Sequence, residues 1–348
     1  MILLVGYKAA DLQDVLARED ARNIVCHTLD IYHRHAIEKT FHGEVRAICT
    51  PHLPETAPDG SPWERVIFRT GPKLMSGELA LDLLQECIKV TRAALSPNST
   101  VTRAALSPNP EKFTLDYVGR ERDRNDLLDK VKERVDRSFK AEWPASVPGG
   151  EKLMFTSYPG CFCHRRLDEG GLALAETVVK EVKSEEGRVK SCGGLRILDM
   201  GCGCGLVGLL IANSILKNAS TLHSSLLPLH LTLIDSHTRA IEAATENAAK
   251  FGIPAEVILS DNGSPARMDG TFDIFVGNPP YYSDYRIADV FLETAKRALK
   301  SGGVCYTVCK NAAGLEPVQR RYFPDVEILH RRGYAILKSF NPPLSNSN

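Results

Sequence analysis

The sequence predicts an α/β fold in which helices cover both faces of a mixed β-sheet. Strand-like apolar segments alternate with helical segments along most of the 348 residues, and this alternation is typical of doubly wound sheets. The last two strand-like segments, residues 326–330 and 334–338, are separated only by Arg331-Arg332-Gly333. A connection this short joins antiparallel strands. The sheet is therefore expected to be mixed rather than fully parallel.

The C-terminal half shows the clearest series of elements. Its seven expected strands cover residues 195–200, 229–234, 255–259, 272–276, 304–308, 326–330 and 334–338. Helices are expected at residues 206–216, 239–250 and 287–300. Gly252 follows the second helix and Gly302-Gly303 follow the third, and glycine is common just past a helix end. This half is expected to form one seven-stranded sheet with a terminal hairpin.

The N-terminal half alternates in a similar but weaker way. Strands are expected at residues 2–5, 24–29, 45–49, 65–69 and 113–118, and helices at residues 12–18, 79–94 and 125–139. No glycine-rich turn or Asn-Pro-Pro sequence follows these strands. Residues 90–98 recur verbatim at residues 101–109, which we interpret as a local duplication or a sequence error. Pro and Gly in residues 144–150 indicate a linker, so the expected domains are residues 1–143 and 144–340, with a tail at residues 341–348.

Composition excludes several classes of protein. The formal net charge is zero, so nucleic-acid binding would require a local basic patch. The ten cysteines include no Cys-x-x-Cys pair, so we expect reduced thiols and no metal site. Residues 1–8 lack the basic start of a signal peptide, and no apolar run is long enough to span a membrane. A cytoplasmic protein is expected.

A glycine-rich turn follows the first strand of the C-terminal half. Asp199 and Met200 end that strand, and Gly201-Cys202-Gly203-Cys204-Gly205 leads into a helix. Alternate glycines let backbone N–H groups approach a ligand closely, and a helix N-terminus favours a carboxylate or phosphate. Gly203, Gly205 and Gly208 also match the spacing of dinucleotide-binding domains. With Gly201 and the preceding Asp199, the turn resembles an S-adenosylmethionine site more closely.

Acidic residues end the next two strands. Asp235 ends the strand at residues 229–234, where a carboxylate can accept hydrogen bonds from both ribose hydroxyls. Asp261 follows the strand at residues 255–259, in a position to receive an adenine amino group. Each acid alone is more often a surface or capping residue. Because ligands of open α/β sheets bind at the carboxyl ends of the strands, their coincidence with the glycine-rich turn indicates a nucleoside-binding site.

Asn278-Pro279-Pro280-Tyr281 follows the fourth strand of this half. The Asn278 side chain can accept a hydrogen bond from an amino group, and the prolines turn the backbone so that the Pro279 carbonyl can point the same way. Tyr281 offers a flat face for a planar group. These features suit a site that holds an exocyclic or amide nitrogen for methylation. A plain proline turn is the structural alternative.

Together these residues resemble class I S-adenosylmethionine-dependent methyltransferases of the small-domain type. Within that group, residues 158–171 (YPGCFCHRRLDEGG) are similar to a segment of bacterial ribosomal RNA guanine-N2 methyltransferases that typically begins Pro-Gly-Val-Phe-Ser and ends Leu-Asp-x-Gly-Ser/Thr. In that family the segment closes over cofactor and target base, which implies a substrate gate containing Phe162, His164 and Asp168. The resemblance covers residues 150–340 well.

The resemblance implies two tandem Rossmann-like methyltransferase folds, of which the N-terminal copy is degenerate and orients the substrate. It further implies S-adenosyl-L-methionine as cofactor, bound by Asp199, Gly201, Cys202, Gly203, Gly205, Asp235, Asp261 and Asn278. The implied reaction is methylation of the N2 amino group of a guanine in ribosomal RNA or a ribosomal subunit, with the small subunit favoured. Two copies of the fold in one chain favour a monomer.

Three departures from the family pattern bear on the target base. Cys161 and Cys163 replace the valine and serine of the gate segment, Gly171 replaces its Ser/Thr, and Tyr282 stands where small-subunit enzymes often carry His. The alternatives are an adenine-N6 nucleic-acid methyltransferase, a release-factor glutamine methyltransferase and a non-catalytic RNA-binding protein. Residues 286–340 carry ten Lys/Arg against five Asp/Glu, which could face RNA phosphates or simply be solvated.

Overall fold

The computed structural model describes residues 1–70, 75–93, 114–118, 138–184, 194–218, 227–280 and 286–342. The chain forms two compact units. Unit 1 consists of Met1–Lys140, Tyr158–Gly160 and His237–Arg239, and unit 2 of Ala141–Ser157, Cys161–Ser236 and Ala240–Asn348. The repeat at residues 101–109 and most of the helix expected at residues 125–139 lie outside the described ranges. Within those ranges, no helix is both long and apolar enough to cross a membrane.

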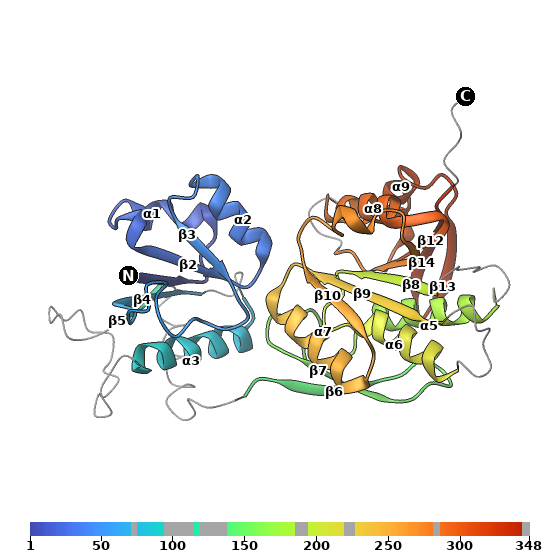
Figure 1. Cartoon of the computed structure of the whole chain (residues 1–348), viewed down its shortest axis with the longest axis horizontal. Coiled ribbons are helices and arrows are strands. Elements are labelled where there is room, and N and C mark those ends of the chain that lie inside the picture. The colour runs from blue at the N-terminus through green and yellow to red at the C-terminus, as the bar shows by residue number, and fades with distance from the viewer. Residues whose placement is uncertain are drawn as a thin grey trace. The chain divides into compact units, whose positions relative to one another are not determined.

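Unit 1 is built on a five-stranded parallel sheet with helices on both faces (Figure 1). In sheet order the strands are β3 (Arg46–Cys49), β2 (Ile24–Thr28), β1 (Ile2–Val5), β4 (Arg65–Arg69) and β5 (Thr114–Val118). Along β1, Leu3 and Val5 pack in one core with α3 (Gly77–Ala93), whereas Ile2 and Leu4 pack in the other. Since successive strand residues face opposite sides, both faces of this sheet are buried.

Unit 1 also contains elements that no periodicity predicts. The helix α2 (Ile31–Thr40) buries only Ile37, so its sequence carries no apolar stripe. Its start is fixed locally, because the Asp30 side chain accepts a hydrogen bond from the backbone N–H of Tyr32 at 2.9 Å. The helix expected at residues 12–18 is shorter, with α1 covering Gln13–Leu16 after the 3₁₀ turn η1 (Ala9–Asp11). A second 3₁₀ turn, η2, covers Ala21–Asn23.

Unit 2 is built on the mixed seven-stranded sheet that the sequence predicts. Its strands in sheet order are β10 (Ala255–Leu259), β9 (Leu229–Asp235), β8 (Leu195–Met200), β11 (Phe272–Gly277), β12 (Leu299–Cys309), β14 (Tyr334–Phe340) and β13 (Glu327–Arg331). The first five are parallel, and β14 runs antiparallel to both of its neighbours. The terminal hairpin is therefore confirmed.

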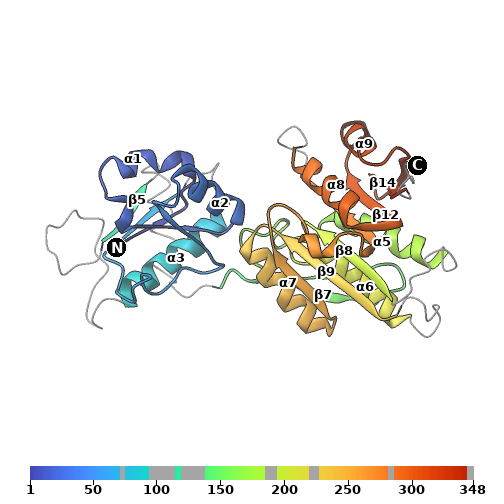
Figure 2. The same ribbon diagram turned by 45° about the horizontal axis from the view of Figure 1, so that its top comes forward.

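Helices cover both faces of this second sheet. Helices α5 (Glu169–Ser184) and α6 (Leu206–Lys217) lie together on one face, and α8 (Arg286–Ala298) and α9 (Ala312–Arg320) on the other (Figures 1 and 2). The remaining elements are α7 (Thr238–Phe251), the 3₁₀ turn η4 (Ala266–Met268) and the two-stranded pair β6 (Ala141–Ala145) and β7 (Leu153–Ser157). Phe291 and Leu292 of α8 pack on Phe275 of β11 in the core. This packing fixes the strand that leads into Asn278.

The end of the third helix and the start of the strand after it differ from those predicted. The third helix ends at Ala298, and Gly302 and Gly303 lie within β12 rather than capping it. These glycines pair with the chain after β14, since Gly302 N donates to Asn341 O and Asn341 N to Gly303 O, both at 2.8 Å. Asn341, the first residue of the expected tail, is consequently buried. The linker expected at residues 144–150 begins inside β6.

Candidate active site

Four parallel strands of unit 2 bring the predicted site residues to one edge of the sheet. In the order β10-β9-β8-β11, the carboxyl ends of neighbouring strands meet there. Asp199 is the penultimate residue of β8, Asp235 ends β9, and Asp261 follows β10. Asn278 comes directly after β11. The structure therefore places all four on the ligand-binding edge of an open α/β sheet.

The glycine-rich turn at residues 201–205 is held by backbone hydrogen bonds. The N–H groups of Gly201 and Cys202 both donate to the carbonyl oxygen of Ile234, at 2.8 and 3.0 Å. Gly201 has a φ of +68°, and a Cβ there would lie 2.6 Å from the ring of Phe291. Only glycine fits this position without strain or collision. The turn is thus tied to β9 on one side and packed against α8 on the other.

Asp199 is buried next to the turn and is hydrogen-bonded to the helix that follows it. Its side chain is 2% exposed, and its Oδ2 atom accepts a hydrogen bond from the backbone N–H of Gly208 at 2.8 Å. Burial raises the pKa of Asp199 to about 7, and the Gly208 hydrogen bond opposes this rise. The carboxyl group is therefore engaged with the first turn of α6. Its predicted contact with the cofactor stays a prediction.

Asp235 lies beside the turn at the end of β9, and Asp261 follows the neighbouring strand β10. Asp235 is half-buried and accepts a hydrogen bond from the backbone N–H of Gly203 at 2.9 Å. The ends of β9 and β10 are joined because Ser260 N donates to Asp235 O at 2.9 Å. A Cβ added at Gly203 would meet nothing within 4 Å among the described residues. Gly203 therefore borders open space, and its N–H holds the Asp235 carboxylate beside it.

Asn278 is half-buried at the end of β11 and bonded to the gate segment. Its Nδ2 atom donates to Asp168 Oδ2 at 2.8 Å. The acceptor atom Oδ1 therefore lies on the opposite side of the amide group. Pro279 is buried and Pro280 is half-buried. Tyr281 and Tyr282 lie outside the described residues, so the stacking role of Tyr281 stays a prediction.

The gate segment has an anchored backbone and an exposed aromatic ring. Ser157 Oγ accepts hydrogen bonds from Trp143 Nε1 at 3.2 Å and from the backbone N–H of Arg165 at 3.4 Å, and it lies 3.0 Å from His164 Nδ1. Phe162 is 66% exposed. Cys163 and Arg165 have positive φ angles of 54° and 64°, and such strained residues cluster at functional sites. The segment presents Phe162 to solvent.

The cysteines of this region are buried thiols. Cys161, Cys202 and Cys204 are each less than a tenth exposed. Burial raises the pKa of Cys202 and of Cys204 far above the usual thiol range, so both are protonated at neutral pH. Among the residues that the structure describes, no group of three or more His, Cys, Asp or Glu side chains is placed to hold a metal ion.

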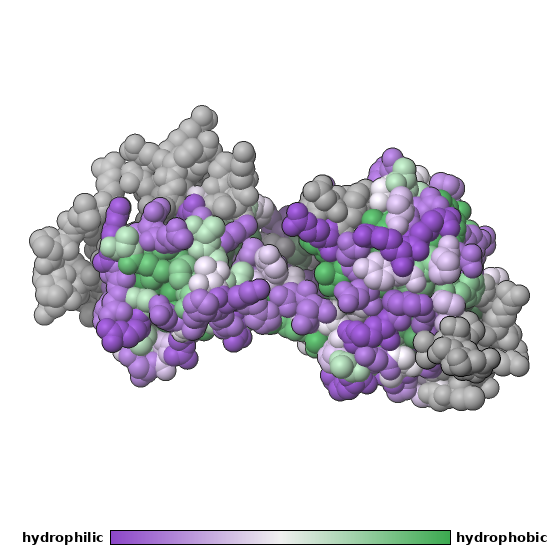
Figure 3. All heavy atoms as spheres, turned by 90° about the horizontal axis from the view of Figure 1, so that it is seen from above, coloured by the Kyte–Doolittle hydropathy of each residue, from purple (hydrophilic) through white to green (hydrophobic). Residues whose placement is uncertain are grey.

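Most of the basic residues at 286–340 are paired with acids. Arg297 contacts Asp269, Lys300 contacts Asp273, and Arg331 and Arg332 both contact Glu176. Arg320, Arg321 and Lys338 are paired in the same way. Figure 3 shows mainly hydrophilic residues over the visible face of unit 2. Because seven of the ten basic side chains are already paired, the stretch is a weaker phosphate-binding surface than its sequence suggests.

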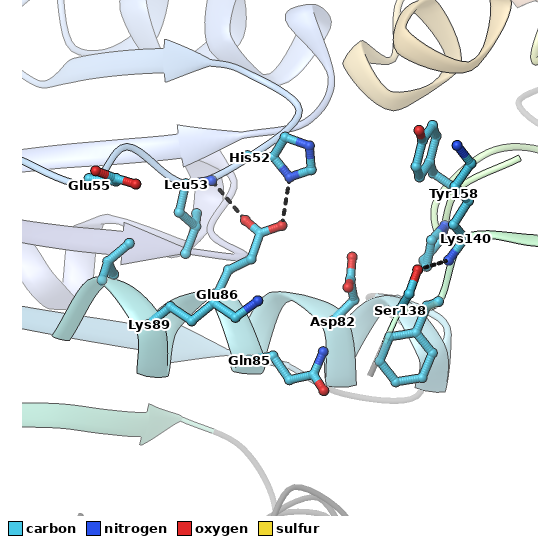
Figure 4. A pocket seen from close by; sticks show the side chains of 13 residues that line it. His52, Leu53, Glu55, Asp82, Gln85, Glu86, Lys89, Ser138, Lys140 and Tyr158 are labelled. Atoms are coloured by element: carbon cyan, nitrogen blue, oxygen red, sulfur yellow. Dashed lines mark hydrogen bonds and ion pairs between the residues drawn. The ribbon is translucent and has the colours of Figure 1, made fainter. Parts of the chain in front are cut away.

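A cavity of about 520 Å³ lies in unit 1. His52, Asp82, Gln85, Glu86, Lys89 and Tyr158 are among the residues that line it (Figure 4). Glu86 Oε1 lies 2.9 Å from His52 Nδ1, and Glu86 Oε2 accepts from Leu53 N at 2.8 Å. Tyr158 and Pro159, at the start of the gate segment, line this cavity, but Phe162, His164, Asp168 and the residues predicted to bind the cofactor do not.

The family model of the methyltransferase small domain matches residues 152–338. The chain belongs to this family. Ribosomal RNA small subunit methyltransferase C of Haemophilus influenzae (strain 86-028NP) is 29% identical over 190 residues, which are 53% of this chain and 50% of that protein. Ribosomal RNA large subunit methyltransferase G of Pseudomonas syringae pv. tomato is 25% identical over 302 residues, 80% of this chain and 70% of that protein. The chain thus spans about half the length of the first of these relatives.

A solved structure shows the same fold over nearly the whole chain. The 16S rRNA N2 methyltransferase of T. thermophilus, solved in complex with AdoMet and guanosine, superposes with a TM-score of 0.66 at 15% identity. The match covers 97% of this chain and 87% of that chain. The α/β methyltransferase fold, with its seven-stranded mixed sheet and an additional parallel sheet, is therefore confirmed.

Proposed function

We propose that this chain transfers a methyl group from S-adenosyl-L-methionine to the exocyclic N2 amino group of a guanine in ribosomal RNA, with the small subunit favoured. The observation that carries the proposal is the position of Asn278, half-buried at the carboxyl end of β11 beside the glycine-rich turn after β8. The names of the relatives, which include both small-subunit and large-subunit ribosomal RNA methyltransferases, support the substrate class.

The residues of the turn suit the proposed cofactor. Gly203 borders open space, and Asp235 offers a half-buried carboxylate to ribose hydroxyls at the end of β9. Gly201, Cys202 and Gly205 keep the backbone close to the ligand, and Asp261 is proposed to receive the adenine amino group. When bound, S-adenosylmethionine supplies a methyl group on a positively charged sulfur.

Asn278 and Pro279 are proposed to hold the acceptor nitrogen. In free guanine the lone pair of this nitrogen is delocalised into the ring, which makes it a poor nucleophile. Hydrogen bonds from its two N–H groups to Asn278 Oδ1 and the Pro279 carbonyl would localise the lone pair and direct it at the methyl group. Pro280 shapes the turn, and stacking on Tyr281 would hold the ring in plane. The methylated nitrogen is acidic, so proton loss needs no dedicated base.

We assign catalysis to residues 144–340 and substrate orientation to residues 1–143, with residues 341–348 as a tail. The gate residues Phe162, His164 and Asp168 belong to the catalytic part. A guanine in a helical region of RNA has to leave its stack to reach such a site, and the exposed Phe162 ring is available to receive it. A ribosomal RNA substrate implies a cytoplasmic enzyme, and we propose that it acts as a monomer.

The test is a transfer assay with methyl-labelled S-adenosylmethionine against four separate acceptors: ribosomal RNA, isolated ribosomal subunits, transfer RNA and release factor. Label in ribosomal RNA or a subunit, lost in Asn278→Ala, is the expected result. Label in release factor alone would assign the enzyme to glutamine methylation. No transfer to any acceptor, together with no binding of S-adenosylmethionine, would refute the proposal and favour a non-catalytic RNA-binding protein.

A further inference from the structure

Asp168 is hydrogen-bonded to the one side chain that the proposed reaction needs in a defined orientation. Asn278 Nδ2 donates to Asp168 Oδ2 at 2.8 Å. Both side chains are half-buried, so the contact lies beside accessible space. We propose that Asp168 is a positioning residue that locks the Asn278 amide with its oxygen toward the acceptor amine. This inference rests on the proposed function.

The chemistry of the pair explains why an acid is needed. A side-chain amide presents a donor on one side and an acceptor on the other, and a half-turn exchanges them. A carboxylate only accepts hydrogen bonds, so it binds the NH₂ side of Asn278 and rejects the oxygen side. The Oδ1 atom is thereby left to accept an N–H group. With the opposite orientation, the NH₂ group of Asn278 would face the amino group that is to be methylated. That amino group would then lose one of its two hydrogen bonds.

Asp168 is itself held by the start of α5. Its Oδ1 atom accepts from the backbone N–H of Gly170 at 3.0 Å, and the N–H of Gly171 also donates to its carboxylate. A carboxylate is favoured at a helix N-terminus, where the backbone N–H groups are unpaired. These bonds hold the carboxylate in place. Its position therefore determines the orientation of the Asn278 amide.

Gly171 makes room for this arrangement. A Cβ at Gly171 would lie 2.6 Å from Asp168 Oδ2, the atom that receives the Asn278 bond, and 3.3 Å from Leu206 Cδ2. The family that this chain resembles carries Ser or Thr at the position of Gly171. Either side chain would displace the Asp168 carboxylate from its position in this structure. The departure from the family pattern is thus linked to the contact between Asp168 and Asn278.

The first test is Asp168→Asn. The introduced amide must still accept from the N–H groups of Gly170 and Gly171, so its own NH₂ turns toward Asn278. The Asn278 amide then rotates, and its oxygen no longer faces the acceptor. We expect kcat to fall about 100-fold, the usual loss when one preorganised hydrogen bond is removed from a transition state. The Kd for S-adenosylmethionine and the KM for RNA should change less than about threefold, because the lost hydrogen bond to the acceptor nitrogen acts mainly in the transition state and the other contacts of both ligands remain.

The second test exchanges the two residues. In the double variant Asp168→Asn/Asn278→Asp, the amide at position 168 donates to the carboxylate at position 278, whose second oxygen is left free to accept. The charge and the number of hydrogen bonds are those of the original pair. We expect the double variant to be at least about tenfold faster than Asp168→Asn, which is a coupling that independent residues do not show.

The matched control is Asp20→Asn in unit 1. Asp20 Oδ1 accepts from the backbone N–H two residues later, that of Arg22 at 3.0 Å, in the same local arrangement as Asp168 and Gly170. This variant should keep kcat within about twofold of the original. A kcat for Asp168→Asn within twofold of the original, or a double variant no faster than that single one, would overturn the inference.

A measurement on the unsubstituted protein is independent of activity. Hydrogen exchange of the Asn278 side-chain NH₂, assigned by its loss in Asn278→Ala, reports directly on the bond to Asp168. We expect exchange at least about tenfold slower than for the exposed Asn262, and unprotected protons would refute the locked orientation. An unsubstituted protein that methylates no RNA, with the Asn278 protons protected, would reject the proposed function and leave the hydrogen-bonded pair established.

Discussion

Asn247 donates a hydrogen bond from Nδ2 to the carbonyl oxygen of Cys204 at 2.9 Å, in the middle of the glycine-rich turn. The same side chain bonds both backbone groups of Thr156 in β7, accepting from its N–H at 2.8 Å and donating to its carbonyl at 2.9 Å. Asn247 is fully buried. This one amide in α7 therefore ties the turn to the strand that leads into the gate segment.

Asn247→Ala should destabilise the protein and weaken cofactor binding. The change leaves three buried backbone groups without their side-chain partners, and each costs on the order of 1–3 kcal/mol. We expect the free energy of unfolding to fall by about 3 kcal/mol or more, measured by urea denaturation. The control is Thr245→Ala, an exposed position on the same helix, which should stay within about 0.5 kcal/mol. Equal effects of the two variants would contradict the assigned role.

Asp199 should make stability depend on pH. Burial raises its pKa from 3.8 to about 7 in the fold, so the folded state holds a proton that the unfolded state has already lost. This group therefore makes the protein less stable as pH rises from about 4 to about 7, with no further change above that. In Asp199→Asn the decline should be shallower, as measured by denaturation at half-unit pH steps. A slope equal to that of the parent would show that Asp199 does not titrate there.

His27 should have the opposite pH dependence. Burial lowers its pKa from 6.5 to about 4, and its ring Nε2 lies 2.9 Å from the Thr50 carbonyl oxygen. The unfolded state takes up the proton first, so the stability contributed by neutral His27 is present above pH 6.5 and is lost as pH falls toward 4. His27→Gln should be less sensitive to acid over this range. Parallel stability curves for the two proteins would argue against a buried neutral His27.

Gly171→Ala should reduce kcat without preventing folding. The added methyl group pushes against Asp168 Oδ2 and so disturbs its bond to Asn278. We expect a decrease of about tenfold or more in kcat, with the Kd for S-adenosylmethionine unchanged. Gly77→Ala is the matched control, because Gly77 also lies in the first turn of a helix and a Cβ there meets nothing within 4 Å among the described residues. A normal kcat for Gly171→Ala would mean that the Asp168 carboxylate can shift without loss of activity.

The sequence predicts the catalytic half well because its signals are local. Strands such as β8 and β11 are short and mainly apolar, and each runs into glycine, at Gly201 after β8 and at Gly277 in β11, so both their type and their carboxyl ends are visible. The seven strands and the antiparallel hairpin follow from those ends and from one short connection, whereas the order of the strands in the sheet is visible only in the structure. The strands of this sheet could therefore be predicted from residues close together in the chain.

What the sequence could not show depends on contacts between distant residues. Gly302 and Gly303 look like a helix cap, but pairing with Asn341 draws them into β12. Asn247 lies in an ordinary alanine-rich helix, and only the folded structure brings it to Cys204. Asp168 was indicated by family resemblance, whereas its bond to Asn278, 110 positions away, has no signal in the sequence.

The most direct test of the central claim is the identity of the methylated nucleoside. Ribosomal RNA labelled by the enzyme and S-adenosylmethionine should be digested to nucleosides and analysed by mass spectrometry, with Asn278→Ala in parallel. The account predicts N2-methylguanosine as the product, reduced at least about 100-fold in the variant. N6-methyladenosine, or an equal yield of product from Asn278→Ala, would contradict it.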